Sequence, residues 1–119
     1  SQVGDAGLAS LKELSSLTDL NLWATQITDT GLADLTQLAG LTKLNLDQTG
    51  VSDAGLEHVG KLTGLKALVL RSTQITDDGV NQLFTLKALE DLNVEFCSSL
   101  GETGKQALRD NLPNVVITE

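Results

Sequence analysis

The sequence predicts a single α/β domain built as a solenoid, with short parallel strands on a concave face and helices on a convex face. One observation behind this prediction is a leucine pattern that recurs every 24 residues. Another is that each recurrence changes from the two-residue period of a strand to the three- to four-residue period of a helix. A third is that the 119 residues include only one Trp and two Phe. We therefore expect an aliphatic core packed in layers, one repeat on the next.

The first half of each repeat is expected to be a strand. It carries the pattern L-x-x-L-x-L, which begins at Leu17, Leu41, Leu65 and Leu89. The alternating leucines of such a segment lie on one face of a strand. A strand-helix unit this short cannot bury its own apolar stripe, so neighbouring units must stack, with their strands in one parallel sheet.

The second half of each repeat is expected to be a helix. It opens with a small residue, found at Thr25, Thr49, Thr73 and Cys97, and continues with Ser/Thr-Asp-x-Gly in the first three full repeats. Apolar residues then recur at helical spacing, at Leu32, Leu35 and Leu38 and at the matching positions of the next two repeats. The Ser/Thr-Asp step is a helix N-capping signal, because its side-chain oxygens are acceptors for free helix N–H groups.

The ends of the chain fit the same frame, so we expect one domain over residues 1–119. Its predicted parts are a half repeat at 1–16, repeats at 17–40, 41–64, 65–88 and 89–111, and a terminal strand at 112–119. The fourth repeat carries one inserted residue near Ser98 and Ser99. Pro113 stands at the junction where the last helix is expected to end and the final strand to begin. The pattern of the expected fifth strand is Leu112-x-x-Val115-x-Ile117.

This pattern resembles the leucine-rich-repeat family, L-x-x-L-x-L-x-x-[N/C/T]-x-L, over essentially the whole chain. The 24-residue length and the T-x-[I/V]-[S/T]-D-x-G-L segment are similar to the cysteine-containing and related bacterial subclass. The resemblance implies a leucine-rich-repeat solenoid that binds a macromolecule, because the family hosts adaptors, receptors and inhibitors. The subclass cysteine occurs only at Cys97, and no cysteine-rich cap flanks the repeats, which argues against an extracellular receptor.

Charge and composition narrow the class of partner. The formal net charge is −8, from sixteen acidic and eight basic residues, and such a surface repels phosphate backbones. No apolar run reaches membrane-spanning length. We therefore expect a protein partner, without nucleic acid, membrane or cofactor. A monomer in the cytoplasm is favoured, and a secreted bacterial protein is the alternative.

The candidate partner-binding residues lie on the predicted concave face, between and after the inward leucines. They are Trp23, Asn45, Asp47, Val69, Arg71, Glu95 and Phe96. Because adjacent strands lie about 4.8 Å apart, Asp47, Arg71 and Glu95 are expected to form a row with the guanidinium between two carboxylates. Trp and Arg are frequent hot-spot residues in interfaces. In the alternative interpretation, Trp23 only shields the sheet edge and the charged row is an ordinary cross-strand ladder.

Metal binding and catalysis are not expected. Asp29, Asp53 and Asp77 recur with the repeat, and helix capping accounts for them better than a calcium loop. Cys97 occupies a small inward position, where a buried structural role is expected. His58 is the sole histidine and has no nucleophile placed beside it by the repeat. A carboxylate pair of Asp47 and Glu95 would stay ionised around Arg71, which leaves no general acid.

A second function hypothesis is that the chain is a structural or self-assembling piece. The N-terminal half repeat leaves the strand around Leu17–Trp23 as a sheet edge with unpaired backbone groups. Another copy of the chain could extend the sheet there. Concentration-dependent mass in solution would separate this hypothesis from a binding module.

Overall fold

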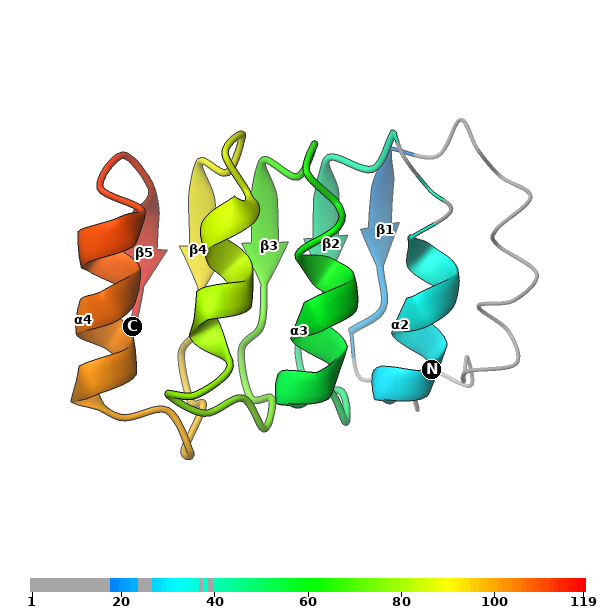
Figure 1. The fold of residues 1–119 in the computed structure, drawn as a ribbon. Helices are drawn as coiled ribbons and strands as arrows, with labels where there is room; N and C mark the ends of the chain where they lie inside the picture. The colour runs from blue at the N-terminus through cyan, green and yellow to red at the C-terminus, as the bar shows by residue number, and fades with distance from the viewer. Residues whose placement is uncertain (1–17, 24–26, 37, 39) are drawn as a thin grey trace.

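The computed structural model describes residues 18–23, 27–36, 38 and 40–119. The predicted half repeat at 1–16 and the positions Leu17 and Thr25 therefore lie outside the described residues. In Figure 1 the strands stand side by side with their arrows in the same direction, and the helices form a second layer in front of them. The strands make one five-stranded parallel sheet in chain order, and they are β1 (Asp19–Asn21), β2 (Lys43–Asn45), β3 (Ala67–Val69), β4 (Asp91–Asn93) and β5 (Val116–Thr118).

The helical layer follows the sequence period, with one change of helix type. The described helices are α2 (Asp29–Leu35), α3 (Asp53–Val59), the 3₁₀ helix η1 (Val80–Thr85) and α4 (Glu102–Asn111). The third repeat thus has a 3₁₀ helix where the sequence predicts the same helix as its neighbours. Its segment contains Val80, Asn81 and Thr85, which are weak α-helix formers, whereas α3 contains Ala, Leu and Glu.

The core lies between the two layers and consists of the inward residues of every repeat. Leu44, Leu68 and Leu92 pair in register across the central strands, and each is at most 2% exposed. Cys97 is buried at 5% exposure, and its thiol donates to the Leu70 carbonyl, as the Thr73 hydroxyl does. The structural role expected for Cys97 is therefore confirmed.

The fifth strand has a different register from the one that the leucine pattern suggests. Ile117, and not Val115, pairs with Leu92. The Val115 amide donates to the Leu112 carbonyl, just as the Leu89 amide donates to the Leu86 carbonyl at the end of the previous helix. Leu112 therefore ends the last helical segment and does not open a strand. The register shifts by two residues, which keeps the same side chains on the inward face.

The Ser/Thr-Asp motif does not cap its own helix. Thr28 and Ser52 are N-cap residues of α2 and α3, and neither makes a side-chain capping bond. Instead, the Asp29 carboxylate accepts from the Ser52 amide at 2.7 Å and from its hydroxyl, one repeat further on. We call the three carboxylates that accept in this way the aspartate ladder; they are Asp29, Asp53 and Asp77.

The aspartate ladder also explains the glycine of the motif. A Cβ atom at Gly79 would collide with the carboxylate of Asp53, and one at Gly55 would collide with that of Asp29. Gly79 has φ −94° and ψ −18°, which any residue can adopt. The position needs glycine for space and not for backbone conformation. The Asp of one repeat and the Gly of the next therefore form one contact between repeats.

An ion pair joins the last strand to the last helix. Arg109 donates from Nε to Glu119 Oε2 at 2.7 Å and from a terminal nitrogen to the other carboxylate oxygen. This fork-to-fork geometry is the strongest arrangement for an arginine and a carboxylate. The hydrogen bonds from Arg109 lower the pKa of the Glu119 carboxyl, and those to Glu119 raise the pKa of Arg109. The pair holds the end of β5 against α4.

Candidate binding surface

The outward side chains of the sheet form three rows, which together we call the concave face. The first row opens the strands and contains Asp19, Lys43, Ala67, Asp91 and Val116. The second closes them and contains Asn21, Asn45, Val69, Asn93 and Thr118. The third follows four of the strands and contains Trp23, Asp47, Arg71 and Glu95. These rows vary from repeat to repeat, while the inward leucines do not.

Six of the seven predicted binding residues fall in the second and third rows, and the seventh, Phe96, directly follows the third row. Trp23 follows β1, and the other five lie on strands β2 and β3 or in the loops after β2 to β4: Asn45, Asp47, Val69, Arg71 and Glu95. The residues of the first row were not predicted, although the alternation of side chains along each strand indicates that they point outward. Residues on both sides of an inward leucine point outward from a strand, so the position before Leu44 belongs to the face as much as the position after it.

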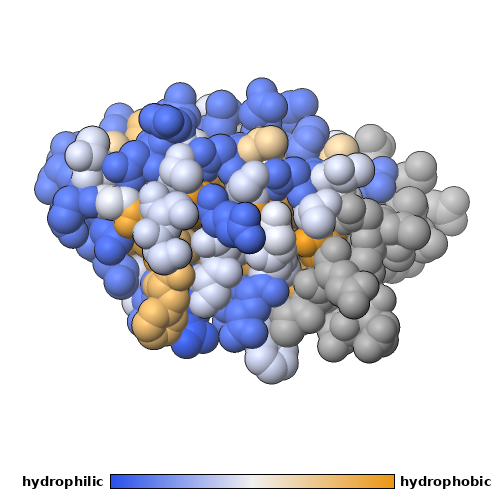
Figure 2. Space-filling view, turned by 90° about the horizontal axis from the view of Figure 1, so that it is seen from below, coloured by the Kyte–Doolittle hydropathy of each residue, from blue (hydrophilic) through white to orange (hydrophobic). Residues whose placement is uncertain are grey.

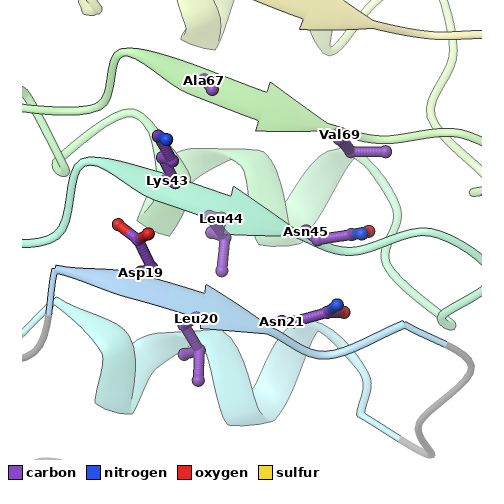
Figure 3. Close-up of a pocket in the computed structure, with 8 residues that line it drawn as sticks. All are labelled: Asp19, Leu20, Asn21, Lys43, Leu44, Asn45, Ala67 and Val69. Atoms are coloured by element: carbon purple, nitrogen blue, oxygen red, sulfur yellow. The ribbon is translucent and has the colours of Figure 1, made fainter.

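A shallow hollow of about 310 Å³ lies on the concave face over β1 to β3. In Figure 3, Asp19 and Lys43 extend to one side of their strands, and Leu20 and Leu44 point the other way. Ala67 and Val69 complete the lining from β3. The third repeat has these short apolar side chains where its neighbours have charged residues and asparagines, and this accounts for the hollow.

The asparagines of the second row serve the backbone. The side-chain oxygens of Asn21, Asn45 and Asn93 each accept from the amide two residues later, at 2.9–3.0 Å. This bond is an Asx turn, which ends each strand and directs the chain into the loop. Asn45 was predicted as a contact residue, and its carbonyl oxygen already has this structural partner. Val69 replaces the asparagine in the third repeat and leaves an apolar side chain there.

Arg71 lies between Asp47 and Glu95, as the strand spacing predicts, but closer to Asp47. One terminal nitrogen of Arg71 is 3.2 Å from Asp47 Oδ2, and its Nε is 4.0 Å from Glu95 Oε1. Asp47 is only 6% exposed, whereas the side chains of Arg71 and Glu95 are 37% and 36% exposed. Asp47 is therefore the buried member of the charged row, and the side chains of Arg71 and Glu95 reach the surface.

The charged row is not a closed hydrogen-bond network. Asp47 Oδ1 and Arg71 Nε are both buried, and neither has a hydrogen-bond partner. An unpaired buried polar group costs about 1–3 kcal/mol. A fork-shaped pairing of Arg71 with Asp47 would satisfy both atoms, but the guanidinium is held partly toward Glu95 instead.

Two aromatic side chains lie exposed at the ends of the strands. Trp23 is 53% exposed and Phe96 is 68% exposed. The Arg71 guanidinium carbon lies 4.8 Å from the centre of the Phe96 ring, which is cation–π geometry. Figure 2, which looks onto the loops that follow the strands, shows a mainly hydrophilic surface with a few hydrophobic side chains in it.

Phe96 also has an unusual backbone conformation. Its φ is 59°, and the matching residues Gln48 and Ser72 have φ 58°. The repeats that begin at Leu41, Leu65 and Leu89 therefore all turn through the left-handed region at this point. A bulky aromatic residue is disfavoured there, and Phe96 combines that backbone strain with an exposed ring.

The described residues carry little of the chemistry that a catalytic or metal site requires. Across 18–23, 27–36, 38 and 40–119, no group of three His, Cys, Asp or Glu side chains could hold a metal ion. Among the same residues, no helix is long and apolar enough to cross a membrane. His58 is half-buried on α3, on the helical side of the molecule. What the concave face offers is apolar, aromatic and charged contact area.

The fold and its outward rows define a repeat solenoid with an open sheet. The family model described as "Leucine Rich repeat" matches residues 61–83, which contain β3 and the first part of η1. The fold is that of a leucine-rich-repeat solenoid. No curated protein sequence matches the chain.

Solved bacterial structures share the fold along nearly the whole chain. Internalin C2 from Listeria monocytogenes matches with a TM-score of 0.72 and 25% identity, over 92% of this chain and 44% of that one. A leucine-rich-repeat protein from Leptospira interrogans matches with a TM-score of 0.62 and 23% identity, over 93% and 33%. A Listeria monocytogenes internalin, inlF, matches with a TM-score of 0.61 and 18% identity, over 93% and 37%. The chain thus spans less than half the length of each of these structures.

Proposed function

We propose that this domain binds a protein partner through its concave face. The observation that carries the proposal is the position of the large exposed hydrophobic side chains among the described residues. These are Trp23, Phe96 and Val116, and all three lie on the sheet strands or on the loops that follow them. Exposed aromatic residues of this kind are the usual anchors of protein interfaces, and an open sheet of five parallel strands offers room for a protein surface.

The strained backbone of Phe96 supports the same proposal. Ser72 and Gln48 occupy the equivalent turn without an exposed aromatic ring. Stability alone does not favour phenylalanine there, because both its backbone conformation and its exposure are costly. A contact that buries the ring in a complex provides a reason for the residue.

The face supports binding better than catalysis. A reaction needs an acid, base or nucleophile placed against a substrate site, and the carboxylates of Asp47 and Glu95 are instead arranged around Arg71. The hollow over Ala67 and Val69 is open and shallow, and its lining is largely apolar. We therefore propose a binding module and not an enzyme.

Site-specific photo-cross-linking tests the proposal. A photoreactive phenylalanine analogue would replace Val69 on the concave face in one variant, and exposed Glu57 or Lys61 on the convex side in matched controls. We expect a partner from the source cell lysate to be cross-linked from position 69 and not from 57 or 61. Capture from the convex positions alone would contradict the proposal. Cross-links between two copies of the chain at residues 18–23 would favour assembly through the sheet edge instead.

A further inference from the structure

We infer that the partner presents a lysine or arginine close to an aliphatic side chain, on the same side of an extended segment. The aliphatic side chain fills the hollow over Ala67 and Val69, and the cation lies on the acidic side of the hollow, between Asp91 on β4 and Glu95, which follows that strand. This inference names the class of partner and rests on the proposed function of the concave face.

The hollow selects a side chain of moderate size without charge. Its floor is formed by Ala67 and Val69, and its other lining comes from β1 and β2. A leucine, isoleucine or valine side chain would bury apolar surface there without stranding a polar group. A charged side chain would lose water over the apolar floor, whereas the charged residues of the lining, Asp19 and Lys43, lie beside the floor on β1 and β2.

Acidic side chains are in excess on the part of the face next to the hollow. The first and third rows contain four carboxylates and two cations, namely Asp19, Asp47, Asp91, Glu95, Lys43 and Arg71. Arg71 already pairs with Asp47 at 3.2 Å. Asp91 is exposed and makes no ion pair with any described residue. Glu95, which follows β4, accepts a hydrogen bond from Asn93 Nδ2 at 3.1 Å and has only the 4.0 Å contact with Arg71 as an ion pair. Asp91 and Glu95 are therefore the carboxylates on the β4 side of the hollow, and Asp19 lies on its β1 side.

The distances fit one short segment. Strand β3, which carries the floor of the hollow, is the direct neighbour of β4, with Val69 opposite Asn93. Neighbouring strands lie about 4.8 Å apart, and side chains on the same side of an extended segment lie about 7 Å apart. A segment that crosses the strands can therefore place an aliphatic residue in the hollow and a basic residue two positions later over β4.

The unpaired atoms of the charged row support a cation at Glu95. Asp47 Oδ1 and Arg71 Nε are buried without partners, and the Asp47 side chain is only 9% exposed. Arg71 is kept from a full pairing with Asp47 by its position between the two carboxylates. A partner cation at Glu95 would replace Arg71 there, so that Arg71 could turn and form a two-bond pair with Asp47. Binding would then satisfy both orphaned atoms.

Selection from a random peptide library displayed on phage tests this inference without a known partner. The purified domain is the target, and enriched peptides are then synthesised. Their affinity is measured through the emission of Trp23, which is the only tryptophan and lies on the concave face. We expect enriched sequences to carry Lys or Arg two positions from Leu, Ile or Val.

Two pairs of variants locate the binding. Asp91→Asn with Glu95→Gln should weaken an enriched peptide roughly tenfold, whereas Asp78→Asn with Glu57→Gln changes the net charge equally on the other side and should have no effect. Ala67→Phe should abolish binding by filling the hollow. Its control is Ala54→Phe, at an exposed position of α3, which should leave binding unchanged. Circular dichroism of each variant confirms the fold.

The outcomes separate the inference from the proposed function. Enriched peptides that are acidic or uncharged, but still blocked by Ala67→Phe, would overturn the inference and leave concave-face binding intact. Peptides that are insensitive to Ala67→Phe and lost with Ala54→Phe would overturn both. Failure of the library to enrich any sequence would overturn the inference of a short linear segment.

Discussion

Two rows of carboxylates cross this molecule, and their surroundings differ. In the aspartate ladder, each carboxylate accepts hydrogen bonds from the next repeat, as Asp53 does from the amide and hydroxyl of Thr76. In the charged row of the concave face, Asp47 keeps an unpaired oxygen, and Glu95 lies 4.0 Å from its cation. The ladder places an aspartate at the same position in three repeats, each accepting from a backbone amide of the next repeat, and the charged row changes at every strand.

The comparison separates residues that hold the stack from residues that are free to bind. An acid repeated in every unit has the same partner in the next unit, so its recurrence follows from packing. An acid that occurs in only one or two units cannot be required by the repeat, and its side chain is available for other contacts.

The largest expected effect is in the core. Leu68→Ala should lower the free energy of unfolding by about 2–5 kcal/mol, because Leu68 is 1% exposed and its removal leaves a cavity. Urea unfolding followed by circular dichroism measures the change. Val69→Ala, one residue further along on the outward face, is the control and should change stability by less than about 1 kcal/mol. Equal losses would mean that the assignment of inward and outward faces is wrong.

Removal of a ladder carboxylate is expected to be the next largest effect. Asp53→Ala leaves the Thr76 amide and hydroxyl without their acceptor, which should cost about 1–3 kcal/mol. Asp91→Ala removes an exposed acid from the concave face and should leave the unfolding midpoint nearly unchanged. Similar losses for the two variants in chemical denaturation would contradict the distinction between the two rows.

The contact between Asp53 and Gly79 can be measured as a coupling. Gly79→Ala should destabilise the fold by about 1–2 kcal/mol, because the new methyl group meets the Asp53 carboxylate. In the Asp53→Ala background the same substitution should cost less, because the carboxylate is gone and only the Cβ atom of residue 53, 2.8 Å from the new methyl group, still meets it. An undiminished loss in the double variant would show that the glycine is required for another reason.

A smaller change in stability, of opposite sign, is expected at the turn that contains Phe96. Phe96→Asn should raise stability by up to about 1 kcal/mol, because asparagine tolerates a φ of 59° better than phenylalanine. The same variant should weaken binding to the partner. Thermal unfolding and an affinity measurement on one preparation test both expectations, and Ser72→Asn serves as the control at the matching turn. Destabilisation by Phe96→Asn would show that the ring contributes to the fold.

The smallest effect is a pH-dependent one at the C-terminal strand. Arg109 lowers the pKa of Glu119 below its ordinary 4.5, so the pair stabilises the fold above that pH. This contribution is lost as the pH falls through the lowered pKa. Arg109→Gln should therefore reduce the melting temperature slightly at neutral pH, and the difference should vanish in acid. Lys87→Gln, which removes an exposed cation elsewhere, should show no such convergence.

The sequence predicts the repeat and the core well because both depend on one period. The inward positions of Leu44, Leu68 and Leu92 follow directly from it, and so does the buried position of Cys97. The pattern does not identify the partner of a polar side chain. Asp29 and Asp53 were expected to cap their own helices, yet their carboxylates reach the following repeat. Local capping and contact between repeats have the same recurrence, so spacing cannot distinguish them.

The irregular parts of the chain are predicted less well. The inserted residue near Ser98 was recognised, but its consequence for the last strand was not, since Leu112 imitates the start of a repeat. On the concave face, alternation gives the direction of a side chain but not its exposure. Asp47 was expected to be a surface contact and is 6% exposed, because Arg71 covers it. Side-chain packing of this kind depends on which residues happen to be neighbours in three dimensions.

The most direct test of the central claim compares partner capture by two double variants. Trp23→Ala with Phe96→Ala removes the two exposed aromatic side chains of the strand ends, and neither substitution leaves a cavity, because the rings are 53% and 68% exposed. Glu57→Ala with Lys61→Ala is the control on the convex side. We expect a partner captured from lysate by the unaltered domain to be retained by the convex variant and lost by the aromatic variant. Capture by the aromatic variant at the unaltered level, with loss by the convex one, would contradict this expectation.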